Sequence, residues 1–111
     1  LASVSNSKKI MEYLLEKEID IEIKSQVLIL ASENGQKEIV ELLIEKGANV
    51  NFKMDTGATP LIMAIQMERE EIVKILMKNG VDIDTKTNEG ISPLIMAAHM
   101  NHIKIVKLLG Y

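Results

Sequence analysis

The sequence contains no cysteine and no tryptophan, and one phenylalanine and two tyrosines are its only aromatic residues. Without cysteine, neither a disulfide nor a thiolate metal site can form. This absence fits a reducing compartment, so we expect the chain to act inside a cell, in its own cytoplasm or in that of a host. Since 47% of the residues are hydrophobic, the chain can build a core, and that core must be aliphatic and rich in methionine.

Excess basic charge and long apolar runs are also missing. The 13 Lys and Arg residues are outnumbered by 16 Asp and Glu residues, which gives a formal net charge of −3. Binding to nucleic acid by phosphate neutralisation requires a concentrated basic face, and a membrane-spanning helix requires roughly 18 consecutive apolar residues. Val27–Ala31 is typical of the longest apolar runs here. We therefore expect neither nucleic acid nor membrane as a partner.

What the sequence does contain is an internal repeat. The segment Gly57–Ala64 (GATPLIMA) aligns with Gly90–Ala97 (GISPLIMA) at an offset of 33 residues, as in 93 − 60 = 33 for the two prolines. Other positions recur at the same offset: Ala31 with Ala64, Ile39 with Ile72, Val40 with Val73, Gly47 with Gly80. One step further back, Ile10–Leu15 matches Ile39–Ile44 at an offset of 39 − 10 = 29. The four-residue deficit lies between residues 22 and 28, and such regular spacing predicts a repeat architecture.

Each copy predicts two short helices. Thr59-Pro60 and Ser92-Pro93 are typical of an N-cap residue followed by proline at the first helical position. We expect this first helix to end near Met67 in one copy and near Met100 in the next. The second helix follows from apolar residues at helical spacing, which in the two central copies are Ile39, Val40, Leu42 and Leu43, and Ile72, Val73, Ile75 and Leu76.

Glycines and turn residues separate these helices. Gly47 and Gly80 stand where a second helix would end in a left-handed residue. Between the repeats, turn residues predict hairpin fingers over 52–58 and 85–91. The shortened segment 23–26 is expected to lack such a finger.

These features predict an all-α solenoid of about three and a half stacked helix-turn-helix repeats, because no helix pair can bury its apolar face alone. The expected division is a partial first repeat over 1–23, a second repeat over 24–53 with a shortened leading loop, a third over 54–86 and a partial fourth over 87–111. Both ends look truncated, so we expect further repeats or another domain beyond one or both of them. Uncapped terminal repeats would also allow the chain to associate end to end.

The repeat resembles the ankyrin repeat along essentially the whole chain. In the third copy the matching residues are Gly57, Thr59, Pro60, Leu61, Ala64, Ile72, Val73, Leu76, Gly80 and Asp82; in the fourth they are Gly90, Pro93, Leu94, Ala97, Ala98, His102, Ile105, Val106, Leu108 and Leu109. Two departures stand out. Ile62 and Ile95 replace the family's histidine, so apolar packing must replace its hydrogen bonds. Glu18 stands at the position of the helix-ending glycines, which predicts a looser first repeat.

The resemblance implies a partner-binding surface. Ankyrin-type arrays bind through the finger tips and the exposed side of the first helices, which correspond here to Asp55, Thr56, Ala58, Gln66, Met67, Asn88, Glu89, Ile91, His99 and Met100. Ser25, Glu33 and Asn34 are the corresponding residues of the second repeat. Exposed apolar side chains with a polar surround mark contact surfaces, which favours a binding role for Met67 and Met100. Packing of these two methionines against neighbouring loops is an equally open alternative.

Nothing in the sequence indicates catalysis, a cofactor or a metal. The acids of the segment 67–71 fit the positive end of a helix dipole better than an acid/base pair. His99 and His102 are three apart, but they straddle a turn, which favours a surface or turn-stabilising role. We therefore expect a non-catalytic protein-protein interaction module. Two alternatives remain: a regulatory or targeting segment of a larger enzyme whose active site lies outside this chain, and a structural spacer.

Overall fold

The computed structural model describes residues 21–110, and those residues form α-helices joined by loops. In chain order the helices are α2 (Ile21–Asn34), α3 (Lys37–Glu45), α4 (Pro60–Gln66), α5 (Glu70–Lys78), α6 (Pro93–His99) and α7 (Ile103–Leu108). No strand occurs within 21–110. The predicted all-helical class is therefore confirmed.

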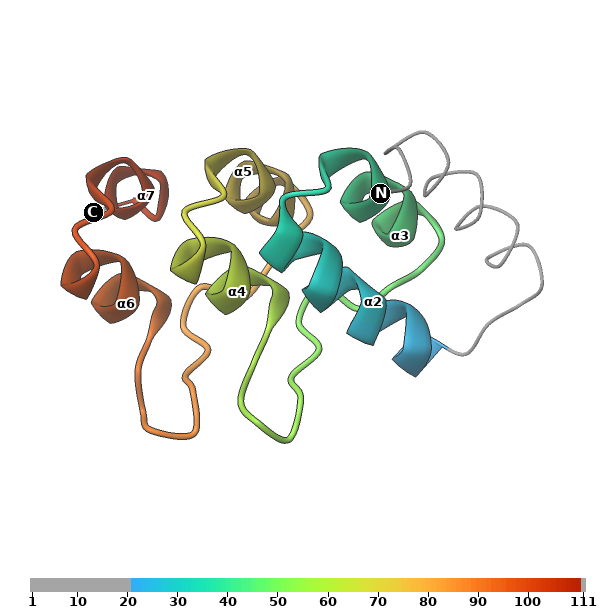
Figure 1. Ribbon diagram of the computed structural model, residues 1–111, viewed down its shortest axis with the longest axis horizontal. Coiled ribbons are helices and arrows are strands. Elements are labelled where there is room, and N and C mark those ends of the chain that lie inside the picture. Colours follow the sequence, from blue (N-terminus) through green and yellow to red (C-terminus); the bar gives the residue numbers. More distant parts are fainter. Residues whose placement is uncertain (1–20, 111) are drawn as a thin grey trace.

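The helices lie in two rows (Figure 1). The inner row consists of α2, α4 and α6, and the outer row consists of α3, α5 and α7. Each inner helix packs on the next inner helix and each outer helix on the next outer helix, while the two helices of a pair pack on each other. This neighbour-upon-neighbour order is that of a helical repeat solenoid. None of the helices in the described part of the chain is long and apolar enough to cross a membrane.

The core lies between the two rows and repeats along the array. Equivalent positions 33 residues apart form columns of buried side chains. These are Ala31, Ala64 and Ala97 on the inner helices, and Ile39, Ile72, Ile105, Leu43, Leu76 and Leu109 on or directly after the outer helices. Alanine in the inner column lets neighbouring helices approach closely. Each large side chain is covered partly by its own helix pair and partly by adjacent pairs, so no pair has a core of its own.

Hydrogen bonds at the helix starts confirm the predicted N-caps. The Thr59 hydroxyl accepts a hydrogen bond from the Ile62 amide at 3.1 Å, and the Ser92 hydroxyl accepts one from the Ile95 amide at 3.2 Å. Proline follows each cap at the first helical position. The helices then end at the residues before Met67 and Met100, as expected.

The expected fingers also form. In the first finger (residues 52–58) the Met54 amide donates to the Ala58 carbonyl at 2.9 Å, and in the second finger (residues 85–91) the Thr87 amide donates to the Ile91 carbonyl at 2.9 Å. Both fingers project from the inner row on the same side (Figure 1). The second helices end as predicted, with positive φ at the glycines that follow α3 and α5.

The segment 23–26 differs from its prediction. It forms no finger, as expected, but it is helix rather than a shortened loop, because α2 begins at Ile21 and runs unbroken for 14 residues. Neither glycine nor proline interrupts it, and too few residues remain here to build a finger. Ser25, expected to contact a partner, is instead buried: its hydroxyl donates to the Ile21 carbonyl at 2.8 Å and accepts from the Asn49 amide at 2.9 Å.

Two further expectations have mixed outcomes. Apolar packing does replace the family's histidine at Ile62, which is buried, but Ile95 at the equivalent position is exposed. The reason is positional, since α6 covers α4 while no described helix pair covers α6. The expectation of a looser first repeat, including Glu18, lies outside the described residues.

We predict that Gly57→Ala destabilises the protein more than Gly80→Ala does. Both glycines have positive φ (89° and 77°), so alanine costs about 1 kcal/mol of backbone strain at either position. A Cβ at Gly57 would also lie 2.8 Å from the backbone nitrogen of Asn88, whereas a Cβ at Gly80 would meet nothing within 4 Å. Urea unfolding of both variants measures the difference, expected to be about 1–2 kcal/mol. Equal losses would contradict the close approach of the two fingers.

We also predict that Thr59→Ala lowers the free energy of unfolding by about 1 kcal/mol, because the Ile62 amide loses its cap. Ser92→Ala removes the equivalent cap from α6, which within residues 21–110 packs on one inner helix, α4. Ser92→Ala should mainly increase local opening of α6, which is measured as faster amide exchange in that helix. The global free energy of unfolding should change less. If Ser92→Ala lowered the global free energy of unfolding as much as Thr59→Ala does, α6 would not be the less stable of the two helices.

Candidate partner-binding surface

A groove of about 460 Å³ lies between the two fingers and the inner helices α4 and α6. We call it the finger groove; it is lined by Thr56, Gly57, Ala58, Ile62, Met63, Gln66, Thr87, Glu89, Ile91 and Met96. The third repeat contributes its finger and α4, and the fourth contributes its finger and α6. The groove therefore exists only because two repeats are stacked.

The finger groove combines apolar residues with exposed polar ones. Met63 and Met96 occupy equivalent positions on successive inner helices, and both are half-buried. The position before them in the array is Leu30 on α2, which is exposed. Among the polar lining residues, Gln66 and Glu89 are exposed. An apolar surface with exposed polar neighbours is what a protein contact surface requires.

Five of the ten predicted site residues come together in this groove: Thr56, Ala58, Gln66, Glu89 and Ile91. The other five do not line it. Met67 and Met100 cap the carboxyl ends of α4 and α6, where they are 44% and 38% exposed. His99, the last residue of α6, is also exposed, as is Asp55 at the first finger's tip.

Asn88 does not line the groove, but it has a role within the fold. Its side-chain amide donates a hydrogen bond to the Asp55 carbonyl of the neighbouring finger at 2.8 Å. Its backbone nitrogen approaches Gly57 so closely that no Cβ would fit there. Asn88 therefore joins the two fingers, and this contact holds them at a fixed separation before any partner binds.

Met63 and Met96 were missed by sequence reasoning, although the sequence contains a signal for them. Each precedes a predicted methionine by four residues, Met63 before Met67 and Met96 before Met100. Residues four apart lie on the same side of a helix. Because the repeated PLIMA segment is apolar throughout, the sequence alone does not separate its methionine from its buried neighbours, and the structure shows that this methionine lines the groove.

Polar side chains also connect the repeats at the turns. The Arg69 guanidinium Nε donates to the Glu33 carbonyl at 3.1 Å. One repeat further on, His102 Nδ1 lies 3.4 Å from the Glu68 carboxylate, and the His102 side chain is only 12% exposed. His102 is thus held in the turn before α7 and faces the preceding repeat. No group of three or more potential metal ligands occurs within 21–110.

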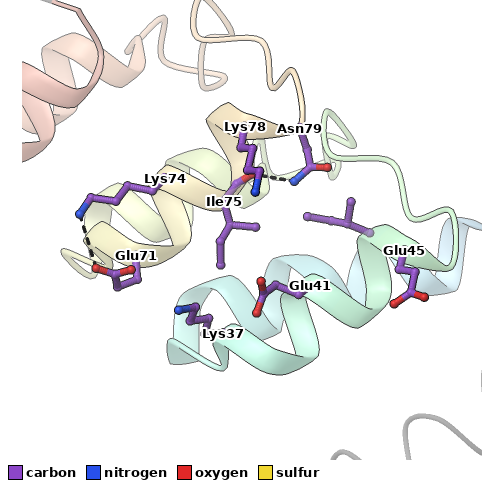
Figure 2. A pocket seen from close by; sticks show the side chains of 9 residues that line it. Lys37, Glu41, Glu45, Glu71, Lys74, Ile75, Lys78 and Asn79 are labelled. Carbon is purple, nitrogen blue, oxygen red and sulfur yellow. Dashed lines mark hydrogen bonds and ion pairs between the residues drawn. The ribbon is translucent and has the colours of Figure 1, made fainter.

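A second groove, of about 520 Å³, lies between the outer helices α3 and α5 (Figure 2). Glu41 and Glu45 line it from α3, and Lys74 and Lys78 line it from α5. Lys74 also pairs with Glu71 on its own helix at 3.5 Å. Because these charges are exposed, they contribute little to stability. Each of the two helices contributes both signs of charge, because Lys37 lines the groove from α3 and Glu71 lines it from α5.

Comparison with known proteins agrees with this architecture. Residues 28–111 match the family model described as "Ankyrin repeats (3 copies)". No match was found among curated proteins. The matched segment begins within α2 and includes both fingers and every helix that follows it in the described chain. The chain therefore belongs to the ankyrin-repeat family, whose members are generally non-catalytic protein-protein interaction modules.

Proposed function

We propose that this chain is a non-catalytic module that binds a partner protein through the finger groove. The observation that carries this proposal is the groove itself, in which two fingers and two inner helices bring apolar and polar side chains together. The exposed side chains of Met67, His99 and Met100 extend the same surface along the ends of the inner helices. The proposed partner is another protein inside a cell. Neither nucleic acid nor a membrane is a proposed partner.

Preorganisation supports this proposal. Binding costs free energy whenever loops and side chains become ordered, and the fingers are already joined by the hydrogen bond from Asn88 to Asp55. Met63 and Met96 add adaptability, since methionine side chains are flexible and polarisable. A rigid backbone with adaptable side chains suits an apolar segment of a partner protein.

We predict that changing Met67, Ile91 and Met100 together to glutamate abolishes partner capture while helicity stays unchanged. None of the three is fully buried, so the fold tolerates charge there, whereas an apolar partner surface does not. Affinity capture with quantitative mass spectrometry measures the binding, and circular dichroism measures the helicity. Met63→Glu should act in the same direction, because Met63 lines the groove directly.

A matched control carries three substitutions on the outer helices, Lys37→Ala, Glu41→Ala and Lys78→Ala. These residues line the groove between α3 and α5 (Figure 2). The outer helices lie on the side of the inner row opposite the fingers (Figure 1). This variant should capture the same proteins in the same amounts as the unchanged chain. If it loses them while the finger-groove variant keeps them, the binding face has been misassigned.

The alternative function is that of a regulatory or targeting segment of a larger enzyme whose active site lies outside this chain. It predicts catalytic motifs in the reading frame beyond residues 1 and 111, so the complete gene sequence distinguishes it from a free-standing module. Self-association through the terminal repeats is a separate expectation. It concerns the terminal repeats of the array rather than the finger groove.

A further inference from the structure

The helix α2 carries apolar side chains on two opposite sides. Its buried side packs on α3 and α4 and consists of Ser25, Leu28, Ile29, Ala31 and Ser32. On the other side lie Ile23 and Leu30, which are 50% and 55% exposed, with the half-buried Val27 between them. We call these three residues the α2 stripe. A surface helix normally has one apolar side, and a second one marks a contact surface.

The repeat fold does not require apolar residues at these positions. In the next two repeats, 33 and 66 residues further along, the position of Ile23 is taken by Thr56 and Glu89, which are polar and exposed on the fingers. The position of Leu30 is taken by Met63 and Met96, which line the finger groove. Because segment 23–26 is helix rather than finger, the α2 stripe is a surface that the later repeats do not have.

The spacing within the α2 stripe favours a helical occupant. Its residues follow each other after four and then three positions, roughly 6 Å and 4.5 Å along the helix axis. This is the interval at which two helices pack side by side with interlocking side chains. Side chains on one face of an extended segment recur every second residue, roughly 7 Å apart, and do not match it.

Charge narrows the chemistry of that helix. Glu22, Gln26 and Glu33 fall on one edge of the α2 stripe by their helical spacing. The basic residue of α2, Lys24, donates a hydrogen bond to the Lys46 carbonyl directly after α3 at 3.2 Å, and so is directed away from this edge. The neighbouring inner helices α4 and α6 contain no Asp, Glu, Lys or Arg. An apolar stripe with an acidic edge favours a basic partner.

We propose that the α2 stripe binds a basic amphipathic helix of a partner protein, which lies along α2. This surface is separate from the finger groove, and the proposal does not depend on the function assigned to that groove. Two other occupants lack the matching charge. Residues 1–20 of this chain have a net charge of 3 − 4 = −1, and a second copy would bring the glutamates of two α2 helices together.

Three fluorescently labelled synthetic peptides test the partner's chemistry on the full chain. Each is about three heptads long. The lysine peptide has leucine at the a and d positions and lysine and alanine elsewhere, and the glutamate peptide has glutamate in place of lysine. The third peptide has the composition of the lysine peptide, with its leucines distributed so that they form no apolar face. Fluorescence anisotropy should show that the lysine peptide binds about tenfold or more tightly than either of the others.

Variants of the chain test the assigned surface. Ile23→Ser with Leu30→Ser should weaken binding of the lysine peptide about tenfold or more, because the α2 stripe loses most of its apolar area. The melting temperature should change by about 2 °C or less, since both side chains are exposed. The matched control, Ile95→Ser with Ile103→Ser, removes two equally exposed aliphatic side chains from the last helix pair and should bind the lysine peptide as the unchanged chain does.

A charge reversal tests the acidic edge. Gln26→Lys with Glu33→Lys should weaken binding of the lysine peptide and strengthen binding of the glutamate peptide, because the edge of the α2 stripe becomes basic. Both differences should shrink as the salt concentration rises. Unchanged preference for the lysine peptide would contradict the assigned edge.

Several results would overturn the proposal. They are a lysine peptide that does not bind, equal binding of all three peptides, and binding that Ile23→Ser with Leu30→Ser leaves unchanged. A loss of about 10 °C in melting temperature from that double variant would show that the chain itself covers the stripe. A dimer in sedimentation velocity that the same variant dissociates would show that a second copy covers it.

The two proposed surfaces can fail separately. The finger-groove variant, in which Met67, Ile91 and Met100 are changed to glutamate, should still bind the lysine peptide. Loss of the peptide in that variant would place it in the finger groove and overturn the assignment to α2. Loss of partner capture with the peptide still bound would support both surfaces.

Discussion

Burial of aliphatic side chains between neighbouring repeats is the interaction on which this structure depends. Leu43 and Leu76 are fully buried, yet each belongs to a helix pair too small to enclose it. The alanine column of the inner helices lets adjacent pairs come close enough to complete that burial. Stability therefore resides in the junctions, and a change at one junction is felt by the repeats on both sides of it.

The same junctions shape the surface. Stacking sets the distance between the two fingers, and Asn88 fixes it with one hydrogen bond to Asp55. The finger groove is thus a consequence of how the repeats pack on one another. Side chains in the turns at the other end of the inner helices also join neighbouring repeats. There Arg69 and His102 each contact the preceding repeat.

The constant spacing of the repeats in the sequence predicts much of this architecture. A 33-residue offset with matching proline and glycine positions predicts the helix pairs, their caps and both fingers. Spacing does not say what a shortened segment becomes, and residues 23–26 join α2 rather than a loop. Spacing also does not say what each side chain contacts. Met63 stands in a run that is apolar throughout, and the sequence gives no sign that Asn88 binds the neighbouring finger. Those assignments depend on what lies opposite each residue.

The length of α2 has a consequence for any ligand that follows the array. Its first two turns stand where a finger would otherwise project (Figure 1). A bound segment that runs along the finger tips toward the amino-terminal side would therefore meet the side of a helix instead of a third finger.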